Sequence, residues 1–356
     1  MGRILGLGIT HYPGLAFKGS LSRRINMLLA DPHLPERLRS PENWPEAMRR
    51  QWAEDEGEAH STVHRQAMID EFRRAREELD AFRPDFVVLW GDDQYENYQE
   101  DCVPAFSVLA YDQVAVQPWN PHGRGMRGEN SWDEPAEKSF TIQGHRAAGK
   151  FLATSLLNEG FDIAYGYKPA HAHPMGHAFV NSVLYMDWDR KGFEYPIVPI
   201  TVNSYGRNLI RHQGTPQTPS ASVALALEAD EDPPGPQPWR CFQLGAAVAR
   251  AAVRSPWKVA LVASSSWSHS FLVEKHGYMY PDVESDKRLY DAFVEGDWDA
   301  WRNVTLEDAE DRGHHELLNW FCLAGAMDQL GRKPDYSVFQ ESWITNSDKV
   351  FAAFRP

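Results

Sequence analysis

Chemically versatile side chains follow three separate apolar segments of this 356-residue chain. His11 comes after the first segment, Asp93 and Gln94 come after the second, and His269 comes after the third. Open α/β sheets bind their ligands at the carboxyl ends of their strands. Imidazole and carboxylate groups there can bind a metal ion or transfer protons. The sequence therefore predicts a ligand site formed where the segments 3–10, 85–90 and 258–263 end.

A second concentration of histidines lies in the phrase HAHPMGH, which contains His171, His173 and His177. By composition it could bind zinc, but the first two histidines would point to opposite sides of an extended chain. At most some of the three can therefore share one ion. A single histidine is usually structural, so the functional interpretation depends on the repeated placement of histidines after apolar segments.

Two further histidines, His60 and His64, lie one turn apart near the start of a predicted helix over residues 56–82. This helix leads directly into the segment 85–90, so it should run antiparallel to the neighbouring strands. Its first turns would then lie at the carboxyl ends of those strands. The sequence thus places both histidines among the candidate ligands.

The remaining pattern predicts an α/β fold, a single domain over residues 1–356 with a central mixed sheet flanked by helices. Two stretches, 112–140 and 205–240, are expected as loop insertions over the active site, since long loops in compact domains are often binding loops. The other expected elements are helices over 144–159 and 243–254, strands over 161–165 and 195–203, and helices from 283 onward.

Composition narrows the class of function. The formal net charge of −14 disfavours nucleic-acid binding. The three cysteines have neither disulfide nor zinc spacing, and no apolar run reaches the length of a membrane span. We therefore expect a cytoplasmic protein with no membrane partner. No phosphate-binding loop occurs, and the SSSWSH phrase lacks the glycines of a hydrolase nucleophile turn.

The ordered phrases GLGITHYPG, RPDFVVLWGDDQYEN, GHAFVNSV, YPIVPITVNSYG, VALVASSSWSHSF and HELLNWFCLAGAM resemble the class III extradiol ring-cleavage dioxygenases. This is the superfamily of the protocatechuate 4,5-dioxygenase catalytic subunit. The nearest branch is similar to 3-O-methylgallate dioxygenase. The resemblance covers nearly the whole chain.

The resemblance implies a mononuclear Fe(II) centre held by two histidines and a glutamate. His11 matches the first ligand, and Glu284, in the Glu-x-Asp phrase, matches the carboxylate. Many members carry the second histidine where this chain has Gln94. We expect His60 to replace it, with Gln94 itself, His64 and His173 as alternatives.

The resemblance also implies roles for the other candidates. His177 matches the acid/base histidine, and His269 is a second catalytic candidate that could orient a ligand or bind a substrate oxygen. The predicted substrate-binding residues are Asp93, Gln94 and His173.

The predicted activity is extradiol cleavage of a catecholic or gallate-like ring by an iron oxidoreductase of aromatic catabolism. Its partners would be the small aromatic substrate and O₂, and the chain is expected to form a homo-oligomer. Two alternatives remain: a binding or scaffold protein that has lost the chemistry, and a metal-dependent hydrolase. Stoichiometric iron would disfavour the first alternative, and activity without O₂ would favour the second.

Overall fold

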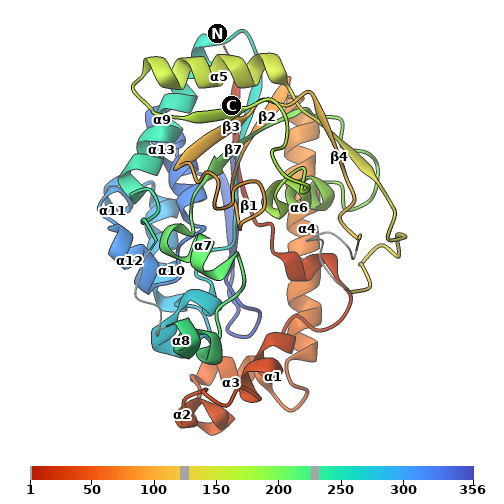
Figure 1. The fold of residues 1–356 in the computed structure, drawn as a ribbon, viewed down its shortest axis with the longest axis vertical. Coiled ribbons are helices and arrows are strands. Elements are labelled where there is room, and N and C mark those ends of the chain that lie inside the picture. The colour runs from red at the N-terminus through yellow and green to blue at the C-terminus, as the bar shows by residue number, and fades with distance from the viewer. Residues whose placement is uncertain (1, 121–127, 226–231) are drawn as a thin grey trace.

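A mixed eight-stranded sheet forms the centre of the molecule (Figure 1). The computed structural model describes residues 2–120, 128–225 and 232–356. The strand order is β6-β3-β7-β2-β8-β1-β10-β9. The predicted fold class, an α/β domain with a central mixed sheet between helices, is confirmed.

The four middle strands run parallel, and the outer strands do not all follow them. β7, β2, β8 and β1 are parallel neighbours, while β3 is antiparallel to β7 and β10 is antiparallel to β1. Parallel strands end at one edge of a sheet, so the middle of this sheet has a single carboxyl edge. The strands are β1 (Ile4–Ile9), β2 (Phe86–Asp92), β3 (Phe106–Leu109), β6 (Ala164–Gly166), β7 (Ile197–Val202), β8 (Val259–Ser264), β9 (Tyr336–Gln340) and β10 (Lys349–Phe354).

Helices cover both faces of the sheet, as Figure 1 shows. Alternate residues of β2 enter opposite cores: Val88 and Trp90 pack with α9 and α13, whereas Val87 and Leu89 pack with α4 and α6. Such burial on both sides explains why the central strands are continuous apolar runs. One layer contains α5 (Arg146–Asn158), α9 (Pro238–Arg254), α10 (Val283–Glu295), α11 (Trp298–Arg302) and α13 (Leu318–Gln329), and the other contains α4 (Glu58–Phe82) and α6 (His177–Met186).

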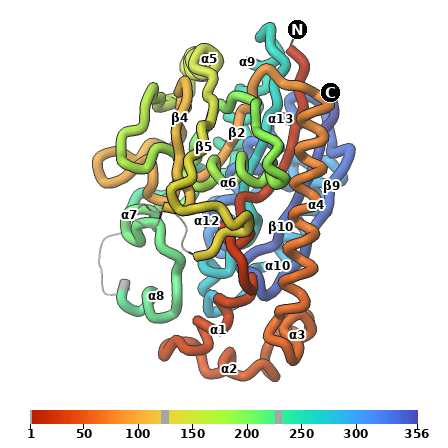
Figure 2. The backbone as a smooth tube through the Cα atoms, turned by 90° about the vertical axis from the view of Figure 1, so that its right-hand side faces the viewer, coloured from red at the N-terminus to blue at the C-terminus, as the bar shows by residue number. Residues whose placement is uncertain are grey.

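Smaller elements extend the molecule beyond the sheet (Figure 2). The short helices α1 to α3 gather at the end of the molecule where α4 begins. These elements are α1 (Arg23–Leu29), α2 (Glu36–Arg39), α3 (Glu46–Trp52), α7 (Leu209–His212), α8 (Pro219–Leu225), α12 (Leu306–Asp311), and the antiparallel pair β4 (Gln113–Val116) and β5 (Phe140–Gln143). Among the described helices, none combines the length and apolarity needed to cross a membrane.

Several predicted elements differ from the observed ones. The stretch 112–140 contains β4 and the first residue of β5, and its positions 121–127 lie outside the described residues. The stretch 205–240 contains α7, α8 and the start of α9, and its positions 226–231 are likewise outside the description. The helical interpretation of the C-terminal region was wrong for β9 and β10, because periodicity cannot separate a short apolar strand from a buried helix.

The length of α4 corrects the placement predicted for its histidines. It contains 25 residues, which corresponds to about 37 Å at 1.5 Å per residue. A six-residue strand such as β1 spans only about 20 Å. The first turns of α4 therefore extend past the carboxyl edge of the sheet, toward α1 to α3 (Figure 2).

Candidate active site

The ends of the four parallel strands bring polar side chains together at the carboxyl edge. Asp92 is the last residue of β2, and His11 follows β1 by two residues. Tyr205 follows β7, and His269 follows β8. A fifth member, Glu316, arrives from the turn before α13. We call His11, Asp92, His177, Tyr205, His269 and Glu316 the edge cluster.

His11 presents a nitrogen lone pair to two carboxylates. Its Nδ1 lies 3.0 Å from the carbonyl oxygen of Ser264, which can only accept, so Nδ1 carries the proton. Its Nε2 lies 3.4 Å from Asp92 Oδ1 and 3.4 Å from Glu316 Oε2. Burial is the main cause that lowers the pKa of His11 to about 4, so the imidazole is neutral at pH 7.

Glu316 is an ionised, buried carboxylate. Burial alone would raise its pKa, but electrostatic interactions with His269 and His11, together with hydrogen bonds from His269 and Tyr205, hold that pKa below its usual value. Its Oε2 lies 3.2 Å from His269 Nε2. Its Oε1 accepts from the Tyr205 hydroxyl and from Gln94 Nε2, the latter at 3.0 Å.

Asp92 has an unsatisfied oxygen. Its side chain is fully buried, and Oδ2 has no hydrogen-bond partner among the described residues. Burial, followed by the negative charge of Glu316, raises the pKa of Asp92. An unpaired carboxylate oxygen is costly in a protein interior. A cation between these acids and His11 would satisfy all three groups.

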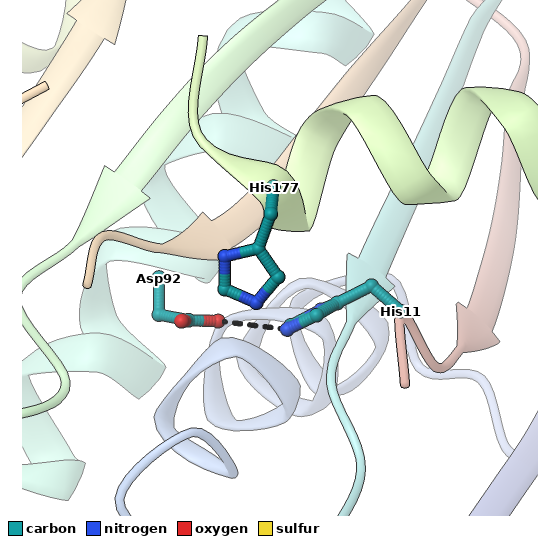
Figure 3. A group of neighbouring side chains, drawn as sticks. All are labelled: His11, Asp92 and His177. Carbon is teal, nitrogen blue, oxygen red and sulfur yellow. Dashed lines mark ion pairs between the residues drawn. The ribbon is translucent and has the colours of Figure 1, made fainter. Parts of the chain in front are cut away.

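His177 is the third member of a possible metal-binding group. The ligand atoms of His11, Asp92 and His177 all lie within 4.8 Å of one another. Figure 3 shows one ring nitrogen of His177 directed at the space between the other two side chains. The other ring nitrogen, Nδ1, lies 3.0 Å from Glu96 Oε2.

Glu96 also fixes the helix that carries this histidine. The backbone N–H of His177, the first residue of α6, donates to Glu96 Oε1 at 2.9 Å. Burial opposes the charged form of His177, but Glu96, followed by Asp92 and Glu316, raises its pKa to about 10. Gly91 permits the close approach of α6 to β2, because a Cβ there would lie 2.9 Å from the Phe179 ring.

His269 completes the edge cluster on the side of Glu316. It is 4% exposed, and its Nδ1 has no hydrogen-bond partner among the described residues. Its Nε2 faces Glu316, so it can donate to that carboxylate. The structure therefore brings together three of the predicted residues, His11, His177 and His269.

Two predicted ligands, Glu284 and His60, lie apart from the edge cluster. Glu284 is exposed in the first turn of α10, where it faces the solvent side of the helix. His60 lies in the first turns of α4, with Nε2 3.2 Å from Ser342 Oγ and its ring stacked on that of His64. Because the first turns of α4 extend past the carboxyl edge of the sheet, His60 lies away from the edge cluster.

The three predicted substrate-binding residues lie in different surroundings. Asp93 accepts backbone N–H groups of Glu96 and Asn97, so it stabilises the turn after β2. Burial and the charge of Glu96 raise the pKa of Asp93 to about 6. Gln94 supports Glu316 and lines a cavity beside the edge cluster. His173 lines a different, larger cavity.

Asp92, Tyr205 and Glu316 were not predicted. Asp92 stands next to the predicted Asp93, and strand residues alternate between faces, so a one-residue difference exchanges their roles. Glu316 follows two histidines immediately before the fully buried start of α13. That run of three titratable residues before a buried helix was a usable signal.

Two cavities meet at His177. The smaller, about 210 Å³, is lined by Gln94, His177, His269 and Glu316 together with Tyr12, Phe17, Arg24 and Phe271. The larger, about 600 Å³, is lined by Glu96, His171, His173 and His177 and by apolar residues including Val116 and Val180. The smaller cavity contains more of the edge cluster.

Comparison with known proteins agrees with the resemblance. Residues 232–352, about a third of the chain, match the family model described as the catalytic LigB subunit of aromatic ring-opening dioxygenase. This range includes His269 and Glu316. The predicted resemblance to the extradiol dioxygenases is confirmed.

Curated relatives carry the name 2,3-dihydroxyphenylpropionate/2,3-dihydroxicinnamic acid 1,2-dioxygenase. The protein of Paraburkholderia phymatum is 26% identical over 197 residues, which cover 55% of this chain and 47% of the relative. The chain thus spans about half the length of that relative. The protein of Rhodococcus globerulus is 23% identical over 76% of this chain and 83% of its own length, and that of Rhodococcus sp is 22% identical over 77% and 86%.

Proposed function

We propose that this protein is a non-haem Fe(II)-dependent dioxygenase that performs extradiol cleavage of a catecholic or gallate-like ring. The family match and the names of the relatives support ring-opening dioxygenase activity. The edge cluster supports the metal. We also propose, as first expected, that the protein is cytoplasmic, acts in aromatic catabolism and forms a homo-oligomer.

The observation that carries the proposal is the lone pair of His11 directed at two carboxylate oxygens. A neutral imidazole nitrogen 3.4 Å from Asp92 and 3.4 Å from Glu316 forms an electron-rich set, and no lysine or arginine of the described residues pairs with either carboxylate. Nitrogen and carboxylate donors around open positions suit non-haem Fe(II). We therefore assign His11, Asp92 and Glu316 as the ligands, in place of the set with His60 and Glu284. Bound Fe(II) would supply a Lewis acid that binds the substrate oxygens and O₂.

His177 is suited to hold and move a proton. Its Nδ1 is fixed by Glu96, and the other ring nitrogen faces the edge cluster. The pKa of about 10 belongs to a cluster of bare carboxylates, and it falls when positive charge enters the site. His177 can then take a proton from a substrate hydroxyl and return it to the product.

His269 and Gln94 hold Glu316 in place. His269 Nε2 contacts one carboxylate oxygen at 3.2 Å, and Gln94 Nε2 donates to the other at 3.0 Å. Groups that orient a ligand in this way commonly affect metal affinity by about 10- to 100-fold. The predicted role of Gln94 thus shifts from substrate contact toward support of a ligand.

The smaller cavity fits a single aromatic ring. An enclosed space of about 150 Å³ is enough for benzene, and this cavity measures about 210 Å³. Tyr12, Phe17 and Phe271 supply aromatic walls. A ring held there lies against both Glu316 and His177.

The decisive experiment is anaerobic loading with Fe(II), followed by measurement of O₂ uptake with catechols, gallates and aminophenols. We expect one O₂ consumed per ring opened, with the absorbance of the ring-opened product appearing in step. Zinc-loaded protein is the control and should consume no O₂. Substrate conversion without O₂ would favour the hydrolase alternative. Substrate binding to iron-loaded protein without O₂ uptake would favour the binding-protein alternative.

A further inference from the structure

The smaller cavity contains an arginine with no acidic partner. Arg24, the second residue of α1, lines the cavity together with Phe271 and Gln94. Its Nη2 donates to the backbone oxygen of Gln217 at 2.6 Å. Its Nε is buried and has no hydrogen-bond partner among the described residues. No carboxylate in the described part of the chain forms an ion pair with it.

Neighbouring cations are satisfied differently. Lys18, which lines the same cavity, pairs with Asp133. Arg65 donates to the backbone oxygens of Leu15 and Gly19. Arg23 also lines the cavity, but its side chain is exposed. Among these four residues, Arg24 alone combines an unused buried N–H with a place on the cavity wall.

Burying such a cation has a cost, which an anion would offset. Burial is the main cause that lowers the pKa of Arg24 to about 10. The group is still charged at pH 7, so its desolvation is not relieved by proton loss. A guanidinium forms strong, directional hydrogen bonds with carboxylates, which makes a carboxylate the fitting occupant.

The position of Arg24 connects this anion site with the reaction. The same cavity is lined by His177, His269 and Glu316. Since it has room for little more than one ring, a ring at the edge cluster brings a short substituent to the Arg24 wall. The guanidinium also lies 5.9 Å from the centroid of the Phe271 ring, another cavity wall.

We propose that Arg24 determines substrate specificity by binding a carboxylate substituent on the aromatic ring. This inference rests on the proposed dioxygenase function, which supplies the ring-bearing substrate. The occupant is a catechol with a short acidic side chain, and neutral catechols bind the same cavity more weakly.

The test compares Arg24→Met with Arg24→Lys and wild type on a carboxylated catechol and on its methyl ester. Wild type should prefer the acid. In Arg24→Met, kcat/KM for the acid should fall about 10- to 100-fold, the scale of a lost charged hydrogen bond, mainly through KM. The ester should change less than about threefold, and Arg24→Lys should recover part of the preference. An acid-to-ester preference that is unchanged in Arg24→Met would overturn the proposal.

Arg37→Met is the matched control, because it removes one positive charge from an exposed helix outside the cavity. Iron content and circular dichroism of each variant verify the fold. If wild type opens neither substrate, the proposed function fails. Calorimetry with a carboxylated aromatic that lacks the diol then tests Arg24 alone: weaker binding by Arg24→Met than by wild type supports the anion site, and equal binding refutes it.

Discussion

Two groups of histidines in this protein differ in the charge that surrounds them. In the edge cluster, His11 faces the carboxylates of Asp92 and Glu316. Near the start of α4, His60 and His64 stack at 5.5 Å between ring centroids, and the nearby charge that lowers the pKa of both is Lys349. For His11, His60 and His64, burial is the largest cause of the lowered pKa.

The charge near the second group makes it a poorer cation site than the first. Lys349 is fully buried, and its ammonium donates to Thr345 Oγ1 at 2.8 Å and to the backbone oxygen of Ser347 at 2.5 Å. Burial lowers the pKa of Lys349 to about 7, and its protonated ammonium beside two imidazoles repels a metal ion. Histidine pairs one turn apart are thus informative only when the charge of their neighbours is known.

The largest expected effect is on Fe(II) affinity, and it distinguishes between the two glutamates that are candidates for the metal ligand. Glu316→Gln should weaken Fe(II) binding by at least about a hundredfold, since it removes a ligand rather than a group that merely orients one. Glu284→Gln is the control, because it makes the same chemical change on an exposed helix turn. Iron titration under anaerobic conditions measures both. Equal losses in the two variants would contradict the assignment.

The next effect concerns proton transfer. His177→Phe should retain iron and bind substrate, but turn over at least about a hundredfold more slowly, which is the usual scale of a lost general acid/base. Single-turnover kinetics on iron-loaded protein measure the chemical step. Because His177 also belongs to the group of possible ligands within 4.8 Å, loss of iron in this variant would identify it as a ligand instead.

The sequence was sufficient for the central parallel strands β1, β2, β7 and β8 and for the edge of the sheet where they end, because buried parallel strands and the polar residues after them are local patterns. The sequence was insufficient to decide which of two candidate acidic residues faces the site. The strand 85–90 continues to Asp92, so Asp92 rather than Asp93 faces His11. Whether Glu284 or Glu316 reaches the site depends on how α10 and α13 pack, and the run of titratable residues before α13 marks Glu316 as a candidate without placing it at the sheet edge.

A smaller effect tests the charge environment of the second group. The folded-state pKa of His64 is well below 6.5, so the folded protein binds fewer protons there than the unfolded chain at acidic pH. Stability from this residue is present above pH 6.5 and is lost as pH falls below it. His64→Gln should therefore reduce the loss of unfolding free energy between pH 6.5 and 5.5 by up to about 1.4 kcal/mol. Urea titrations at both pH values measure the free energy of unfolding. An equal change in that free energy between the two pH values in variant and wild type would exclude this account.

The smallest expected effect is that of His60→Ala on iron. His60 contacts Ser342 and His64 rather than any member of the edge cluster, so Fe(II) affinity should stay within about twofold of wild type, well under the tenfold or larger losses typical of residues that orient a ligand. Gln94→Ala is the comparison, since Gln94 donates to Glu316 and its loss should weaken iron binding about tenfold. These expected results are the opposite of those expected if His60 completes the ligand set. A large loss of iron in His60→Ala would show that the start of α4 reaches the metal after all, and that the repulsion from Lys349 does not decide which histidines bind it.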